Sequence, residues 1–173
     1  MKWLLIVVAA LAGLVAIVWL IGALLPKGHV AARSAQFRQP PESIWRAITD
    51  VAAFPSWRTD VKSVERLPDR DGHAAWREVN KHGQALTLET VEFLPPHRLV
   101  ARMADPKLPF GGTWTYEISP ADGGSQLTIT ENGEVYNPIF RFMARYVFGY
   151  YGTLEEYQKA LGKKFGEEVR WAS

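Results

Sequence analysis

The chain of 173 residues contains no cysteine. Disulfide bonds, thiolate catalysis and cysteine-ligated zinc or iron–sulfur sites are therefore excluded. The chain also has little excess charge, because 20 Lys and Arg residues stand against 18 Asp and Glu residues. Lys2 is the only charged side chain among the first 26 residues, so the remainder keeps this balance. It argues against nucleic-acid binding, which usually shows a basic stripe.

Sequence motifs for common catalytic and metal sites are missing as well. There is no Gly-x-Ser-x-Gly elbow and no glycine-rich phosphate loop. The four histidines, His29, His73, His82 and His97, have none of the spacings of metal-ligand pairs, and all fall near predicted turns. We therefore expect solvated loop histidines, no metal site and no cofactor.

One long apolar run is present, from Trp3 to Leu25. As a helix it is ~34 Å long, enough to cross a hydrocarbon core of ~30 Å. A cleaved signal peptide is the alternative, but its apolar region is usually only ~7–15 residues long. No small-x-small cleavage pattern precedes Pro26. The sequence predicts a transmembrane anchor over residues 1–26, followed by one domain over residues 27–173.

The side of the membrane on which this domain lies is less clearly indicated. The N-terminal amine and Lys2 flank one end of the apolar run, and Lys27, Arg33 and Arg38 follow the other. The positive-inside rule therefore gives nearly a tie. The basic residues after Pro26 favour a domain on the inner side, whereas the very short N-terminal tail favours a single-pass protein with an exported domain. Of the two, we expect the exported arrangement.

The domain begins with a predicted strand over residues 29–37. A helix is expected to open at residues 39–42, with proline in its first turn, and Phe54-Pro55 predicts a second short helix. Six strand-like runs follow, separated by short Pro-, Gly- and Asp-containing turns that are typical of an antiparallel meander. These runs are Val61–Leu67, Ala74–Lys81, Gln84–Leu94, Arg98–Ala104, Thr113–Ser119 and Ser125–Val135.

The C-terminal part changes to a helical period. Asn137-Pro138 is a typical helix start, and apolar residues three and four apart continue to Phe165. This predicts one long amphipathic helix, weakened in the middle by Gly149 and Gly152. We expect its apolar stripe, Phe142 included, to provide the main core contact with the sheet, and a cavity to remain between sheet and helix.

The order of these elements resembles the SRPBCC superfamily, also called START-like or helix-grip proteins, which includes polyketide cyclases and lipid-transfer domains. The resemblance covers residues 29–168 and extends to a membrane-anchored subfamily of the polyketide cyclase/dehydrase type. It implies an α+β fold in which a curved antiparallel sheet wraps around a long C-terminal helix. The segments that carry it are Pro40–Trp45, Phe54–Trp57, Glu92–Leu99, Phe110–Trp114 and Thr130–Glu134.

Candidate ligand-binding residues are those expected on the opposed faces of the sheet and the long helix. The aromatic ones would form an apolar pocket or simply fill the core. The two carboxylates would act as an acid or base if buried in the pocket, although ion pairing with Arg77 or Arg102, or a solvated position at the rim, is favoured. The candidates are Trp76, Glu78, Trp114, Tyr116, Glu131, Phe142, Tyr146 and Tyr150.

Three functions are compatible with these features. The favoured one is a membrane-anchored module that binds a hydrophobic small molecule such as a lipid, a quinone or a polyketide-like metabolite. The alternative is a cyclase or dehydratase that uses a pocket carboxylate or tyrosine. The third is a protein-binding domain with a vestigial pocket. No catalytic residue is predicted, and the ligand and the oligomeric state stay open.

Overall fold

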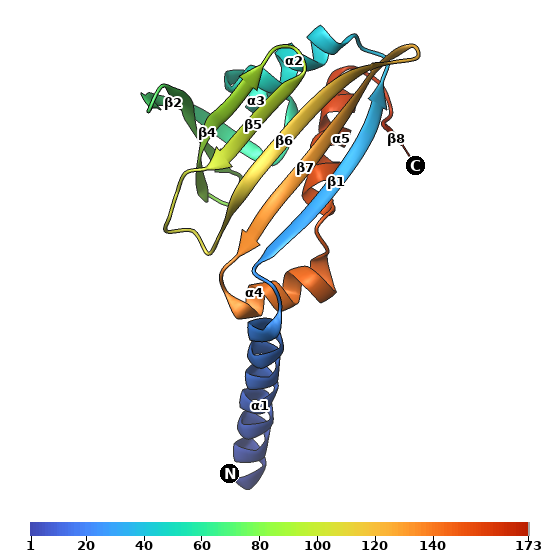
Figure 1. The fold of residues 1–173 in the computed structure, drawn as a ribbon. Coiled ribbons are helices and arrows are strands. Elements are labelled where there is room, and N and C mark those ends of the chain that lie inside the picture. The colour runs from blue at the N-terminus through green and yellow to red at the C-terminus, as the bar shows by residue number, and fades with distance from the viewer. Residues whose placement is uncertain (173) are drawn as a thin grey trace.

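The structure is a computed structural model that describes residues 1–172. Helix α1 (Lys2–Leu24) projects from a domain in which a curved sheet partly encloses helices (Figure 1). The elements of the domain are β1 (Gly28–Phe37), α2 (Pro41–Thr49), the 3-10 turn η1 (Val51–Ala53), α3 (Phe54–Trp57), β2 (Val61–Arg70), β3 (His73–Asn80), β4 (Ala85–Leu94), β5 (Arg98–Met103), β6 (Phe110–Ala121), β7 (Gly124–Val135), α4 (Pro138–Met143), the π-helical turn η2 (Ala144–Phe148), α5 (Gly152–Lys164) and β8 (Arg170–Trp171).

The sheet is antiparallel and its strand order is β2-β3-β4-β5-β6-β7-β1-β8. The predicted meander from β2 to β7 is confirmed, because each strand pairs with the next along the chain. The first strand returns beside the last long one, with Gly28 opposite Glu134 and Phe37 opposite Ser125. The two-residue strand β8 was not predicted.

Helix α1 is the element among residues 1–172 that is long and apolar enough to cross a membrane, although an N-terminal signal sequence has the same properties. Its last turn contacts α4 directly. A Cβ atom at Gly22 would overlap the carbonyl oxygen of Pro138, so this approach requires glycine. Arg141 of α4 donates a hydrogen bond to the carbonyl of Leu25 at 2.7 Å. These contacts join α1 to the domain.

The main core lies between the concave face of the sheet and the helices. Leu127 and Ile129 of β7 and Leu154 and Leu161 of α5 are fully buried there. Their positions follow from the period of two in a strand and of about 3.6 in a helix, which place every member of each pair on the buried face. The helix-grip fold predicted from the sequence is confirmed, and α5 is the C-terminal helix that the curved sheet encloses.

The predicted single helix over residues 137–165 is wrong in its middle. Gly149 has φ 73°, a backbone conformation that favours glycine, and it separates η2 from α5. The first part therefore does not continue along the sheet. Phe142 is half-buried and its ring lies 5.1 Å from that of the exposed Tyr146, outside the main core. The expectation that Phe142 forms the main core contact is also wrong.

Two leucines test where the core lies. Leu154 is fully buried in α5, whereas Leu94 at the end of β4 is 54% exposed. Leu154→Ala should lower the free energy of unfolding by about 2–5 kcal/mol, because it removes buried methyl groups and leaves a cavity. Leu94→Ala should change it by less than about 0.5 kcal/mol. Denaturant unfolding of the full-length protein in detergent measures both, and equal effects would contradict this core.

Candidate functional site

A cleft of about 500 Å³ opens between α2–η1 and strands β2 to β5. Its interior is mainly apolar, and charged and polar side chains stand among its lining residues. This composition is typical of sites that bury an apolar ligand and orient it with a few polar groups. The apolar side chains are Ile48, Val51, Ala74, Trp76, Val91, Phe93 and Leu99, and the polar ones are Thr49, Arg66, Asp69, His73, Thr90 and Glu92.

Local sequence patterns position the walls of this cleft. Helix α2 begins at Pro41, and its apolar Ile48 follows Ile44 by four residues and Trp45 by three, so all three share one face and are buried. Trp45 packs against Phe93 of β4 with ring centroids 5.0 Å apart. This contact connects the helix to the sheet beside the cleft.

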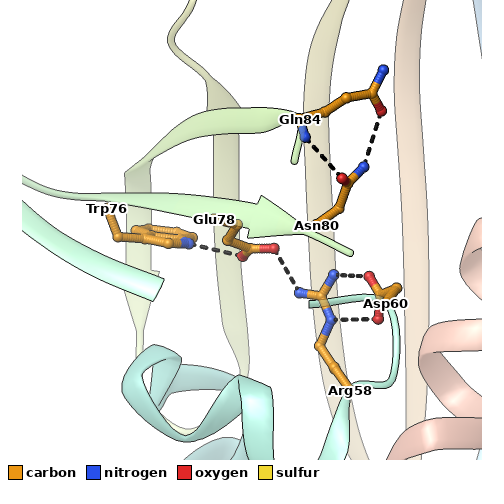
Figure 2. A network of polar contacts seen from close by, with 6 residues as sticks. All are labelled: Arg58, Asp60, Trp76, Glu78, Asn80 and Gln84. Atoms are coloured by element: carbon orange, nitrogen blue, oxygen red, sulfur yellow. Dashed lines mark hydrogen bonds and ion pairs between the residues drawn. The ribbon is translucent and has the colours of Figure 1, made fainter. Parts of the chain in front are cut away.

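Trp76 connects the cleft to a polar network that joins β3 to the turn before β2 (Figure 2). Its indole Nε1 donates to Glu78 Oε1 at 2.9 Å, and Arg58 Nη1 donates to Glu78 Oε2 at 3.0 Å. Arg58 also donates to Asp60, at 2.6 Å from Nη2. Both oxygens of the Glu78 carboxylate are thus occupied by protein donors, which supports a structural role for this residue.

Arg58 is the central cation of this network. Burial alone would lower the pKa of Arg58, but the carboxylates of Glu78 and Asp60 outweigh burial and raise the pKa above its ordinary value. Its guanidinium also lies over the rings of Phe54 and Tyr157, at 5.1 and 5.2 Å from the centroids. The charge is therefore permanent and is stabilised from several directions.

Three aromatic residues pack together between the sheet and α5, where the sequence predicted a cavity. The ring of Tyr157 lies 5.5 Å from that of Tyr116 and 6.1 Å from that of Trp114. Tyr116 and Tyr157 are buried, and burial raises the pKa of both phenols. Both hydroxyls stay protonated at neutral pH, so neither is an available general base.

A second polar cluster lies at the end of the concave face nearer to α4. Glu131 Oε1 is 3.4 Å from His29 Nε2, and the ring of His29 stacks on Tyr150 with centroids 4.0 Å apart. Burial raises the pKa of the Glu131 carboxyl, and hydrogen bonds from His29, Thr153 and Trp114 only partly oppose the shift. A carboxyl with a raised pKa beside an imidazole is suited to proton transfer or to hydrogen bonding with a polar ligand group.

The structure distributes the eight predicted site residues over four places. Within residues 1–172, Trp76 is the one that lines the cleft, and Glu78 lies directly behind it. Trp114 and Tyr116 belong to the aromatic cluster around Tyr157, and Glu131 and Tyr150 belong to the second polar cluster. Phe142 and Tyr146 lie on α4 and η2, away from the sheet.

Other residues of these clusters were missed or misjudged from the sequence. Arg58 was not considered, although it directly follows the apolar Phe54–Trp57 segment, where a basic residue is well placed to pair with a carboxylate. His29 was predicted to be a solvated loop residue, but it lies in β1 and only 12% of its side chain is exposed. The predicted ion-pair partners were also wrong, because Arg77 pairs with Glu65 and Arg102 with Glu89.

Solved structures share this fold. A START superfamily protein from Mycobacterium smegmatis is similar with a TM-score of 0.61 and 20% identity, over 79% of this chain and 96% of that one. A protein from Mesorhizobium loti gives 0.57 and 18% over 78% and 98% of the two chains. The Zhui aromatase/cyclase from Streptomyces sp. R1128 gives 0.53 and 16% over 62% and 68%.

No protein of curated function matches the chain. At these identities the structural neighbours establish the START-like fold alone. The family described as polyketide cyclase / dehydrase and lipid transport matches residues 29–163, which is most of the chain and covers the elements from β1 to nearly the end of α5. The chain therefore belongs to the polyketide cyclase/dehydrase and lipid transport family.

Proposed function

We propose that this protein binds a hydrophobic small molecule in the cleft between α2–η1 and strands β2 to β5, and that α1 anchors it in a membrane. The observation that carries the proposal is the cleft itself, whose volume is about 500 Å³. Ligand pockets commonly enclose ~300–1,000 Å³ and have mostly apolar walls with a few polar groups. A lipid, a quinone or a polyketide-like molecule has the matching chemistry.

The polar groups of the cleft would orient such a ligand rather than hold it by charge. Arg66 is paired with Asp69, and Glu92 is paired with Arg98. Because these charges are already neutralised in pairs, the cleft favours a neutral or weakly polar molecule over an anion. His73 and Thr90 remain as lining groups that can exchange hydrogen bonds with a carbonyl or hydroxyl.

The catalytic alternative, a cyclase or dehydratase, has weaker support from the geometry. Glu78 is occupied by Trp76 and Arg58, so it is not free to accept a proton from a substrate. Glu131 has the raised pKa expected of an acid or base, but it does not belong to the lining of the cleft. The arrangement therefore favours binding over turnover.

The proposed structural role of Glu78 can be tested by its removal. Glu78→Ala should lower the free energy of unfolding by about 2–3 kcal/mol; this is less than the ~3–5 kcal/mol typical of leaving a buried charge unpaired, because Asp60 remains beside Arg58. The matched control is Glu65→Ala, which breaks the exposed pair with Arg77 and should cost less than about 1 kcal/mol. Denaturant unfolding that ranks the two in reverse would contradict the structural role.

Ligand binding is tested by filling the cleft. Val51→Trp should weaken the binding of a quinone or an uncharged lipid by about tenfold or more, because excluding two or three methylene groups costs ~2 kcal/mol. Val30→Trp, at an exposed valine of β1 outside the cleft, should leave the affinity unchanged. Tryptophan quenching and ligand-induced shifts of the melting temperature measure both. An absence of saturable binding across a broad panel of apolar ligands would refute the binding function.

Anchoring by α1 makes a separate prediction. The full-length protein should stay in the membrane pellet after washing with alkaline carbonate, because removing an uncharged helix of this length from lipid is strongly unfavourable. The intact mass of the purified protein should include the residues from Trp3 to Leu25. A mature protein that begins near Pro26 would instead identify α1 as a cleaved signal sequence.

A further inference from the structure

The segment formed by α4 and η2 leaves an unusual number of large apolar side chains uncovered. Four of them are between 52% and 72% exposed, although the same segment is held firmly against α1. Large exposed apolar side chains that are gathered in one short segment often mark a contact site. We define the α4–η2 face by these residues, which are Phe140, Tyr146, Val147 and Phe148.

All charged side chains of this segment are basic. Between Val135 and Leu154 there is no Asp or Glu, whereas Arg141 and Arg145 are present. Arg141 is buried at the joint with α1, and Arg145 is exposed beside the aromatic residues. Aromatic and aliphatic side chains combined with basic ones are the signature of segments that lie in the membrane interface, where the bases attract lipid phosphates.

The position of the segment agrees with this chemistry. Helix α4 lies across the C-terminal end of α1 (Figure 1), and Gly22 contacts Pro138 there. Gly22 is within one turn of Leu25, the last residue of the apolar run, so α4 lies at the depth where hydrocarbon gives way to headgroups. Strand β1 begins at Gly28, which leaves almost no linker through which the domain could swing away.

We propose that the α4–η2 face inserts into the headgroup region of the bilayer that α1 crosses. This inference rests on the proposed anchoring by α1, and it adds a second, interfacial contact. Arg141 donates a hydrogen bond to the carbonyl of Leu25 at 2.7 Å, and this contact fixes the orientation of the interfacial segment relative to the spanning helix. The domain is thereby held in one orientation on the membrane surface.

The lack of native cysteine permits a direct test with single nitroxide labels on introduced cysteines. The variants are Val147→Cys and Phe148→Cys on the proposed contact, and Leu14→Cys in α1. The matched control is Leu94→Cys at the end of β4, where the native side chain is 54% exposed, close to the 58% of Val147. Full-length protein is placed in vesicles of phosphatidylcholine and phosphatidylglycerol, and collision rates with oxygen and with a water-soluble nickel complex are measured by electron paramagnetic resonance.

We expect labels at Val147 and Phe148 to collide with the nickel complex several-fold less often than the label at Leu94, and with oxygen more often. A water-exposed label at Phe148 together with a lipid-protected label at Leu14 would overturn the interfacial contact while leaving the anchor intact. Water exposure at both would show that the anchoring itself fails. Protection at Phe148 that disappears when the protein is diluted with lipid would assign the face to a second copy of the chain and also overturn the proposal.

Discussion

The rest of the structure depends on the packing of α5 against the concave face of the sheet. Leu154 and Leu161 pack there against Leu127 and Ile129, and all four are fully buried. A strongly curved sheet is wider than one helix, so α5 covers only part of its concave face. The short helices α2 and α3 must cover more of it, and Trp57 of α3 meets the ring of Tyr157 edge-on at 5.4 Å. The cleft is the part of this face, over β2 to β5, that the helices do not close.

The strands were predictable because their signals are local. Alternating apolar residues and turn-forming residues identified each strand from β1 to β7 close to its observed bounds, and the amphipathic pattern from Ile44 to Ile48 identified α2. The break in the C-terminal helix was not predictable in the same way. Gly149 and Gly152 marked a weak point, but the apolar spacing continues across them, and the positive φ of Gly149 is what shows that the chain turns there. The position of the cleft also depends on how helices far apart in sequence share the sheet.

Glu78 and Glu131 show how far sequence reasoning reaches at a site. Period-two alternation placed both on the concave face, and they do lie there. The same alternation argues against Arg77 as a partner of Glu78, because adjacent residues of a strand point to opposite faces. The actual partner, Arg58, comes from the turn before β2 and required the tertiary structure to identify. The two carboxylates lie in different environments. Glu78 forms an ion pair with Arg58, whereas burial raises the pKa of Glu131 beside His29.

The location of the cleft constrains how a ligand would reach it. Leu99 in the cleft pairs with Tyr116, and the path back along β6 from Tyr116 to Phe110, beside Val135 and α4, is roughly 20 Å at ~3.3 Å per residue. If α1 spans the bilayer and α4 lies at its surface, the length of that path is the upper limit of the distance between this part of the cleft and the lipid. A ligand dissolved in the membrane would have to leave the bilayer before it enters. On the proposed anchoring, α1 would keep the cleft close to the surface, and transfer would go through water or through another protein at the same surface.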